Sequence, residues 1–325
     1  MKSAPIAVLL AAGCVTLLQI AAQVAAPGLS PQPDSEQGAF QISVNVALVV
    51  LEATIRDHEG HAVPQLKRED FEVFEDGRPQ PIRLFRHEDT PVTVGLLIDH
   101  SGSMREKLEE VTAGARAFVR SSNSRDQMFV VNFNETVSQG LPLSLRFSDS
   151  VEQLGAAVWG RPAVGTTALY DAIVEGLTRL QEGAREKKVL IVISDGGDNA
   201  SKAPLDRVLK MAEQSNAMIY TIGIFDQDDP DGKPGVLRRL AHETGGQAFF
   251  PSELTETVEI CERIARDIRD QYTIGYSSAS EKRDGMYHKI RLTARSKTGG
   301  KLAVRTRAGY SEADASPALS GRVTK

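Results

Sequence analysis

The chain has 325 residues, of which 41% are hydrophobic and 25% are charged, and its formal net charge is −5. A chain of this length and composition is long enough for two globular domains. The basic surplus that is typical of nucleic-acid-binding proteins is missing, so we expect no nucleic-acid partner.

The N-terminal residues have the pattern of a targeting segment. Lys2 precedes an apolar run, Ala4–Ala26, whose end is rich in alanine. We interpret residues 1–26 as a signal peptide, or as an N-terminal anchor if they are retained, because the run is long enough to span a bilayer. The protein is therefore expected to be exported to the periplasm or the extracellular space, and to contact a membrane only through an uncleaved segment. Residues 27–39 and 312–325 are expected to form a disordered linker and a flexible tail.

The chain has two cysteines, and Cys14 lies within the apolar N-terminal run. Cleavage of that run would leave Cys261 alone, which excludes an internal disulfide in the mature protein. Cys261 belongs to a series of apolar residues at helical spacing, so we interpret it as a core thiol rather than a nucleophile or a metal ligand. The series comprises Leu254, Val258, Cys261, Ile264 and Ile268.

Residues 40–90 have the alternating pattern of β-strands, with Val49–Ile55 as one candidate strand. The run Phe71–Gly77 ends in Asp-Gly, which favours a hairpin turn with Pro79–Phe85 as the returning strand. Residues 271–311 form a second β-segment with similar alternation. Because neither segment is large enough to bury a core alone, we expect the two to join in one β-sandwich that flanks the region between them.

Between the β-segments, residues 91–270 alternate short apolar runs with amphipathic stretches. This alternation predicts an α/β domain with a doubly wound, mostly parallel sheet and helices on both faces. The expected strands are Val92–Ile98, Met128–Phe133, Val189–Ile193, Ile219–Phe225 and Gln247–Phe250. The expected helices cover residues 108–119, 169–180, 205–212 and 253–270.

The strand Val92–Ile98 is followed by an acidic residue and two hydroxyl residues at alternate positions, which are Asp99, Ser101 and Ser103. They leave the carboxyl end of a strand, which is the edge where open α/β sheets bind their ligands. Carboxylate and hydroxyl oxygens suit a hard cation, so we expect a Mg²⁺ site here, with Mn²⁺ or Ca²⁺ as alternatives.

Two further groups are expected at the same edge of the sheet. Asp195 comes just after the strand Val189–Ile193, and Thr167 lies in a loop that runs into a helix. The two carboxylates and one divalent cation balance in formal charge. Neutral hydroxyl ligands leave the cation able to accept another carboxylate from outside the protein.

Residues 92–270 resemble the von Willebrand factor type A (VWA) domain, because the Asp-x-Ser-x-Ser motif is followed by a threonine and an aspartate in that family's order. The resemblance implies a metal-ion-dependent adhesion site, whose residues hold the metal directly or through water. The flanking segments are similar to those of a bacterial exported subgroup of VWA proteins. The implied metal ligands are Asp99, Ser101, Ser103, Thr167 and Asp195.

The same residues allow two alternatives to this assignment. The VWA family often has Gly-Gly-Thr in the threonine loop, whereas this chain has Gly165-Thr166-Thr167, which leaves Thr166 as an alternative ligand. Ser101 or Ser103 could also serve as the N-cap of a helix that begins near Met104.

Other polar groups are weaker candidates for a site. The loop Asp226–Gly232 is acidic, but Pro230 and Leu237 stand where an EF-hand calcium loop needs oxygen ligands, so we interpret it as a solvated surface loop. Trp159, the only tryptophan, is interpreted as a packing residue, with the rim of the metal pocket as the alternative. The six histidines show no metal-ligand spacing.

The resemblance implies a binding protein rather than an enzyme. We expect the chain to capture an Asp or Glu side chain of a protein partner through the metal, because family members adhere to or assemble with proteins. One alternative is a structural component of the cell envelope with a stabilising metal site. Another is a metal-dependent hydrolase, for which no His or Glu beyond the ligands is evidently placed as a general base.

Overall fold

The structure, a computed structural model, describes residues 48–159, 162–225, 232–278, 286–296, 300 and 302–311. The expected signal or anchor (1–26), linker (27–39) and tail (312–325) lie outside these residues, as does the part of the first β-segment before Leu48. The described residues contain two separate hydrophobic cores, one in an α/β region and one among antiparallel strands.

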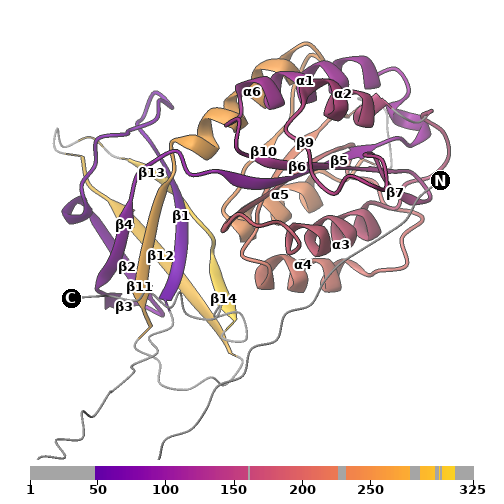
Figure 1. Ribbon diagram of the computed structural model, residues 1–325. Helices are drawn as coiled ribbons and strands as arrows, with labels where there is room; N and C mark the ends of the chain where they lie inside the picture. Colours follow the sequence, from indigo (N-terminus) through magenta and orange to yellow (C-terminus); the bar gives the residue numbers. More distant parts are fainter. Residues whose placement is uncertain are drawn as a thin grey trace, which may run out of the picture. The chain divides into compact units, whose positions relative to one another are not determined.

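A six-stranded sheet lies at the centre of the α/β region, with the strand order β10-β9-β8-β5-β6-β7 (Figure 1). All neighbouring strands are parallel except β6 and β7, which are antiparallel. Every residue of β5 and β9 is buried, because helices cover both faces of the sheet and these strands are nearly continuous apolar runs. The strands are β5 (Val92–Asp99), β6 (Gln127–Phe133), β7 (Val137–Gln139), β8 (Lys187–Ser194), β9 (Met218–Gly223) and β10 (Ala248–Phe249).

Helices cover this sheet, with α1, α2 and α6 on one face and α3, α4 and α5 on the other (Figure 1). The helices α1 and α6 approach closely, because Gly114 of α1 has no side chain and lies against Cys261 and Thr257 of α6. Among the described residues, no helix has the length and apolar character needed to cross a membrane. The helices are α1 (Leu108–Ser121), α2 (Val151–Trp159), α3 (Leu169–Leu180), α4 (Leu205–Gln214), α5 (Pro234–Thr244) and α6 (Glu256–Arg269).

The thiol of Cys261 is buried on α6, which confirms the prediction of a core residue. Burial raises the pKa of this thiol to about 12, so the group stays protonated and unreactive at neutral pH. Ile264 and Ile268 are buried on the same helix, as their helical spacing predicts.

Two four-stranded antiparallel sheets combine strands that precede and follow the α/β region in the sequence. Their strand orders are β13-β1-β11-β4 and β14-β12-β2-β3, and Leu51 of β1 lies opposite Ile274 of β11. Both sheets contribute to one core, which includes Val73 and Tyr272. The predicted fold class, a doubly wound α/β domain with a flanking β-sandwich, is therefore confirmed. The strands are β1 (Leu48–Arg56), β2 (Phe71–Glu75), β3 (Arg78–Gln80), β4 (Ile82–Arg86), β11 (Tyr272–Ser277), β12 (Tyr287–Ala294), β13 (Ala303–Arg305) and β14 (Gly309–Ser311).

The segment expected as one returning strand is divided between the two sheets. The first part, β3, pairs with β2, whereas β4 pairs with β11. Pro81 lies between them, and a proline cannot donate a backbone hydrogen bond within a sheet. The hairpin turn itself is confirmed, since Asp76 and Gly77 have φ angles of 48° and 79°, which this turn type requires.

Buried ion pairs connect the sandwich strands to the α/β region. The carboxylate of Asp267 on α6 pairs with Arg56 of β1 and with Arg305 of β13, the latter at 3.1 Å. The ammonium group of Lys187, at the start of β8, lies 3.1 Å from a carboxylate oxygen of Glu52 on β1. Burial raises the pKa of Glu52, and the attraction of Lys187 opposes that effect. Because Asp267 and Lys187 are almost completely buried, these pairs hold α6 and β8 against the sandwich strands.

Candidate metal centre

The carboxyl ends of two adjacent strands, β5 and β8, meet near the middle of the central sheet. The strands are parallel, with Ile98 opposite Ile193. From β5 the chain continues to β6 on one side of the sheet, and it later returns to β8 on the other side. This reversal is a topological switch point, where open α/β sheets leave a crevice for ligands. Asp99 ends β5 and Asp195 follows β8, so the fold brings both carboxylates to this point.

The carboxylate of Asp99 is fully buried and accepts a hydrogen bond on each oxygen. Oδ1 accepts the backbone N–H of Ser101 at 2.8 Å, and Oδ2 accepts the hydroxyl of Ser194 at 2.6 Å. Burial, together with the nearby charge of Asp195, raises the pKa of Asp99 to about 6, although the hydrogen bonds from Ser194 and Ser101 oppose this effect. A carboxylate in this environment favours a cation beside it.

The carboxylate of Asp195 is also buried, and both its oxygens are oriented by neighbours. Oδ2 accepts the hydroxyl of Ser103 at 2.5 Å, and Oδ1 accepts the backbone N–H of Gly197 at 3.0 Å. Gly196, between them, has a φ angle of 79°, and a Cβ there would lie 2.9 Å from the carbonyl oxygen of Lys233. Glycine is therefore required for the turn that points Asp195 toward Ser103.

The two serine hydroxyls face each other and do not cap a helix. The Oγ atoms of Ser101 and Ser103 are 3.1 Å apart. A short 3₁₀ helix, Gly102–Met104, follows Ser101 without a hydrogen bond to its side chain, and α1 begins only at Leu108. Ser101 therefore occupies the N-cap position of the 3₁₀ helix without a capping hydrogen bond from its side chain, and the hydroxyls of both serines belong to the carboxylate cluster.

The threonine loop lies against the first segment of the site. The backbone N–H of Gly102 donates to the carbonyl oxygen of Gly165 at 3.0 Å. The glycine at 165 has a φ angle of 81°, and a Cβ there would overlap the carboxylate of Glu135. Thr167 is buried and its backbone N–H donates to Asn199, whereas Thr166 is exposed. The structure thus favours Thr167 over Thr166 as the better-oriented hydroxyl.

The charge balance of this cluster fits a divalent cation. Among the described residues, no lysine or arginine forms an ion pair with Asp99 or Asp195. Two buried carboxylates without a basic counter-ion are unfavourable unless a cation joins them. The other polar groups nearby are hydroxyl oxygens, which are suitable ligands for Mg²⁺ or Ca²⁺.

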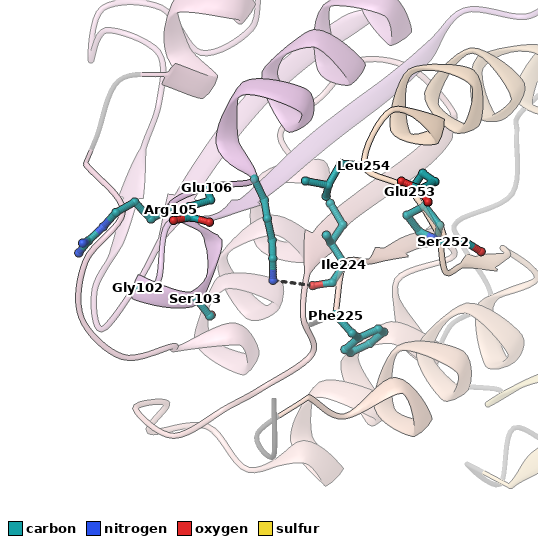
Figure 2. Close-up of a pocket in the computed structure, with 11 residues that line it drawn as sticks. Gly102, Ser103, Arg105, Glu106, Ile224, Phe225, Ser252, Glu253 and Leu254 are labelled. Atoms are coloured by element: carbon teal, nitrogen blue, oxygen red, sulfur yellow. Dashed lines mark hydrogen bonds between the residues drawn. The ribbon is translucent and has the colours of Figure 1, made fainter. Parts of the chain in front are cut away.

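A pocket of about 500 Å³ adjoins the serine side of this centre (Figure 2). One wall consists of Gly102, Ser103 and residues 105–107, and the others consist of residues 224–225 after β9 and residues 251–254 before α6. The buried side chain of Lys107 donates a hydrogen bond to the carbonyl oxygen of Ile224 at 3.3 Å, which joins two of these walls. The carboxylate cluster therefore lies beside a cavity large enough for a side chain of a partner.

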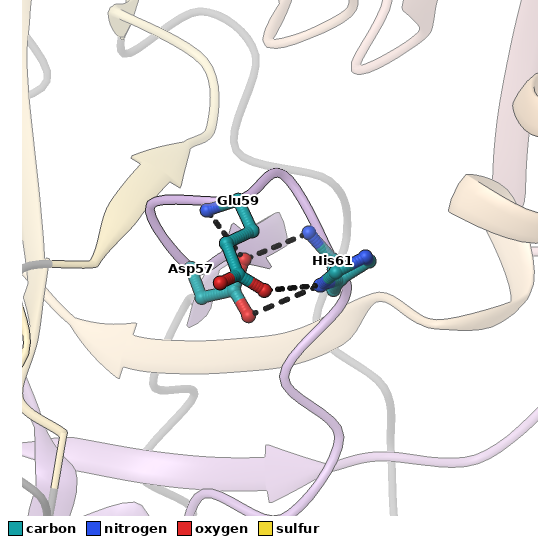
Figure 3. Close-up of side chains that lie close together, drawn as sticks. All are labelled: Asp57, Glu59 and His61. Carbon is teal, nitrogen blue, oxygen red and sulfur yellow. Dashed lines mark hydrogen bonds and ion pairs between the residues drawn. The ribbon is translucent and has the colours of Figure 1, made fainter.

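A second group of potential metal ligands, Asp57, Glu59 and His61, lies in a turn after β1 (Figure 3). Oδ1 of Asp57 accepts the backbone N–H groups of His61 at 2.8 Å and of Glu59 at 3.0 Å. These bonds, led by that from His61, lower the pKa of Asp57. The turn alone accounts for the proximity of the three side chains, so we assign no metal to them.

Two other sequence candidates have different outcomes. Residues 226–231 of the acidic loop lie outside the described residues. Trp159, at the end of α2, is 57% exposed, so its interpretation as a packing residue is wrong. Such an exposed ring contributes little to the core.

Two residues that hold the centre were not assigned from the sequence. The hydroxyl of Ser194 donates to Asp99 and accepts the backbone N–H of Gly196 at 3.0 Å. Ser194 ends a strand and directly precedes Asp195, and this position in the sequence could have identified it as part of the site. Asn199 contacts Thr167, which is 32 residues away in the sequence, and no local pattern indicates that pairing.

A family model for the von Willebrand factor type A domain matches residues 94–263, just over half of the chain. The chain therefore belongs to the von Willebrand factor type A domain family, and the resemblance seen in the sequence is confirmed. The matched range contains Asp99, Ser101, Ser103, Thr167 and Asp195.

Several known proteins are similar to this chain. Mouse integrin alpha-X is 28% identical over 190 residues, which are 54% of this chain but only 15% of the integrin subunit. A von Willebrand factor type A structure from Catenulispora acidiphila is 15% identical, covers 87% of this chain and 79% of its own, and has a TM-score of 0.49. Proximal thread matrix protein 1 from the mussel byssus, with a zinc-occupied MIDAS motif, is 17% identical, with 56% and 49% coverage and a TM-score of 0.46.

Proposed function

We propose that this chain is an exported protein-binding module that captures an acidic side chain of a partner through a divalent cation, with Mg²⁺ as the expected ion. The cation would supply a coordination position for a carboxylate oxygen of the partner. The observation that carries this proposal is the convergence of two buried carboxylates and two serine hydroxyls at the switch point of a VWA domain. The residues that would hold the ion, directly or through water, are Asp99, Ser101, Ser103, Thr167 and Asp195.

Membership of the VWA family supports a binding role rather than catalysis, because domains of this family generally serve protein interaction. The pocket beside Ser103 supports the same role, since it could receive the partner residue next to the metal-binding carboxylate. Export is proposed from the pattern of residues 1–26 alone.

Thr167→Ala is expected to lower the affinity for Mg²⁺ about 10- to 100-fold while the fold stays intact. The Thr167 hydroxyl has no hydrogen-bond partner among the described residues, so its removal leaves no protein group unpaired. Titration calorimetry of the full chain would measure the affinity, and thermal unfolding without metal would test the fold. The neighbouring Thr166→Ala variant is the matched control, and an equal loss from it would contradict the assignment of Thr167.

The partner chemistry is testable with peptides selected for binding in the presence of Mg²⁺. Each selected peptide is expected to contain one Asp or Glu whose replacement by Asn or Gln abolishes binding. Chelation by EDTA should have the same effect. Binding that survives both changes would argue against capture through a metal. Loss of stability on metal removal, without any acidic peptide that binds, would favour a structural role instead.

A further inference from the structure

One short segment after Asp195 holds the backbone of Thr167 on both sides. The N–H of Thr167 donates to Oδ1 of Asn199 at 2.8 Å. Its carbonyl oxygen accepts the backbone N–H groups of Asn199 and Ala200, both at 3.0 Å. Both peptide groups that flank the Cα atom of Thr167 are therefore fixed by the same two residues.

Fixing these peptide groups also restricts the direction of the Thr167 hydroxyl. With the backbone on both sides held, the chirality of Cα sets the direction of Cβ. Threonine is branched at Cβ, so few side-chain rotamers are accessible from that position. The hydroxyl itself makes no hydrogen bond within the described part of the chain, which leaves it available to a ligand.

The segment that carries Asn199 is itself anchored to the start of α3. Oδ1 of Asp198 accepts the backbone N–H of Tyr170 at 3.1 Å. The two carboxylate oxygens of Asp171 accept the backbone N–H groups of residues 202 and 203, each at 2.9 Å. Asn199 is therefore presented to Thr167 by a loop with defined geometry.

We propose that Asn199 is a positioning residue of the metal centre, whose side-chain oxygen orients Thr167 for binding of the divalent cation. This inference rests on the proposed function, because it assumes that Thr167 is a ligand. Asn199 acts through Thr167 and does not itself contact the ion. Its side chain is exposed, so its replacement removes the hydrogen bond to Thr167 without creating a cavity in the core.

Asn199→Ala is expected to lower the Mn²⁺ affinity of the full chain about 10- to 100-fold, as is usual for residues that orient metal ligands. Mn²⁺ is the probe because its electron paramagnetic resonance signal separates free from bound ion. The metal-free variant is expected to unfold at nearly the wild-type temperature. Asn199→Asp keeps an acceptor oxygen at the same position, so its affinity is expected to stay close to that of the wild type. An Asp variant as weak as the Ala variant would overturn the proposal.

A double-mutant cycle separates positioning from a general effect on the fold. If Asn199 acts through Thr167, then Asn199→Ala is expected to cause almost no further loss of Mn²⁺ affinity in a Thr167→Ala background. A full 10- to 100-fold loss in that background would overturn the proposal. If Thr167→Ala alone leaves the affinity unchanged, the assigned ligand set fails instead. If Thr167→Ala weakens binding and Asn199→Ala does not, only the role of Asn199 fails.

Discussion

Asp99→Asn is expected to lower the affinity for Mg²⁺ about 100-fold or more and to abolish Mg²⁺-dependent capture of acidic peptides. Asparagine has nearly the same shape as aspartate, but it removes one of the two negative charges that balance the cation. The remaining carboxylate, Asp195, and the neutral hydroxyls are not expected to bind Mg²⁺ tightly without it. Titration calorimetry of the full chain measures the effect, and an affinity within tenfold of the wild type would refute the assigned site.

The same substitution is expected to stabilise the protein when no metal is present. In the metal-free state at pH 7, Asp99 is a buried carboxylate next to Asp195, with no basic partner among the described residues. Its pKa is about 6 instead of the usual 3.8. Each pKa unit corresponds to about 1.4 kcal/mol, so removal of the charge is expected to add at most roughly 3 kcal/mol to the free energy of unfolding, less the cost of the one hydrogen bond that the amide nitrogen of Asn cannot accept. Urea denaturation of the wild type and the variant in EDTA would measure this difference in the free energy of unfolding.

The pH dependence of stability provides an independent check on Asp99. Between the pKa of the unfolded chain, 3.8, and that of the folded protein, about 6, the folded protein keeps a proton that the unfolded chain has released. The contribution of Asp99 to stability is therefore greatest below pH 4 and is lost as the pH rises through 6. The Asp99→Asn variant has no titrating carboxyl group at this position, so its stability is not expected to fall in this way, and it is the matched control. If the stability of the wild type and that of the variant change with pH in parallel in EDTA, the pKa of Asp99 is not raised.

Asp267→Ala is expected to lower the free energy of unfolding by about 3–5 kcal/mol. The carboxylate of Asp267 is 2% exposed and pairs with both Arg56 and Arg305, so its removal leaves two largely buried guanidinium groups without their anion. Arg305 also lies over the ring of Tyr220, with its Cζ 5.7 Å from the ring centroid, so it cannot move to solvent without losing that contact. Guanidinium chloride denaturation of the full chain would measure the loss.

The matched control for Asp267 is Glu262→Ala on the same helix. Glu262 is 41% exposed and forms an i,i+4 ion pair with Arg266. Exposed pairs of this kind contribute about 0.3–0.5 kcal/mol, so the control is expected to unfold almost like the wild type. If both variants lose the same amount of stability, the buried pairs of Asp267 do not hold α6 to the sandwich strands.

Local sequence signals identified most of the helices and strands, but three elements of the α/β region were missed. The strands β5 and β8 were predicted because continuous apolar runs end in polar residues. The helices α2 and α5 and the strand β7 were not predicted. The helix α2 has only nine residues, and two of its four buried positions are Gly155 and Ala157, which add little to an amphipathic pattern. Packing against the sheet stabilises such a short helix, and a short stretch of sequence shows little of that packing.

The family, the central α/β pattern and the candidate ligands could be predicted from the amino-acid sequence, because apolar periodicity and the Asp-x-Ser-x-Ser motif are properties of neighbouring residues. The contacts between residues that are distant in the sequence could be known only from the folded chain. In the fold, one expected strand is divided between two sheets at Pro81, Ser103 donates a hydrogen bond to Asp195, and Asn199 accepts one from Thr167. These contacts depend on strand order and loop packing, which bring together groups separated by many residues along the chain.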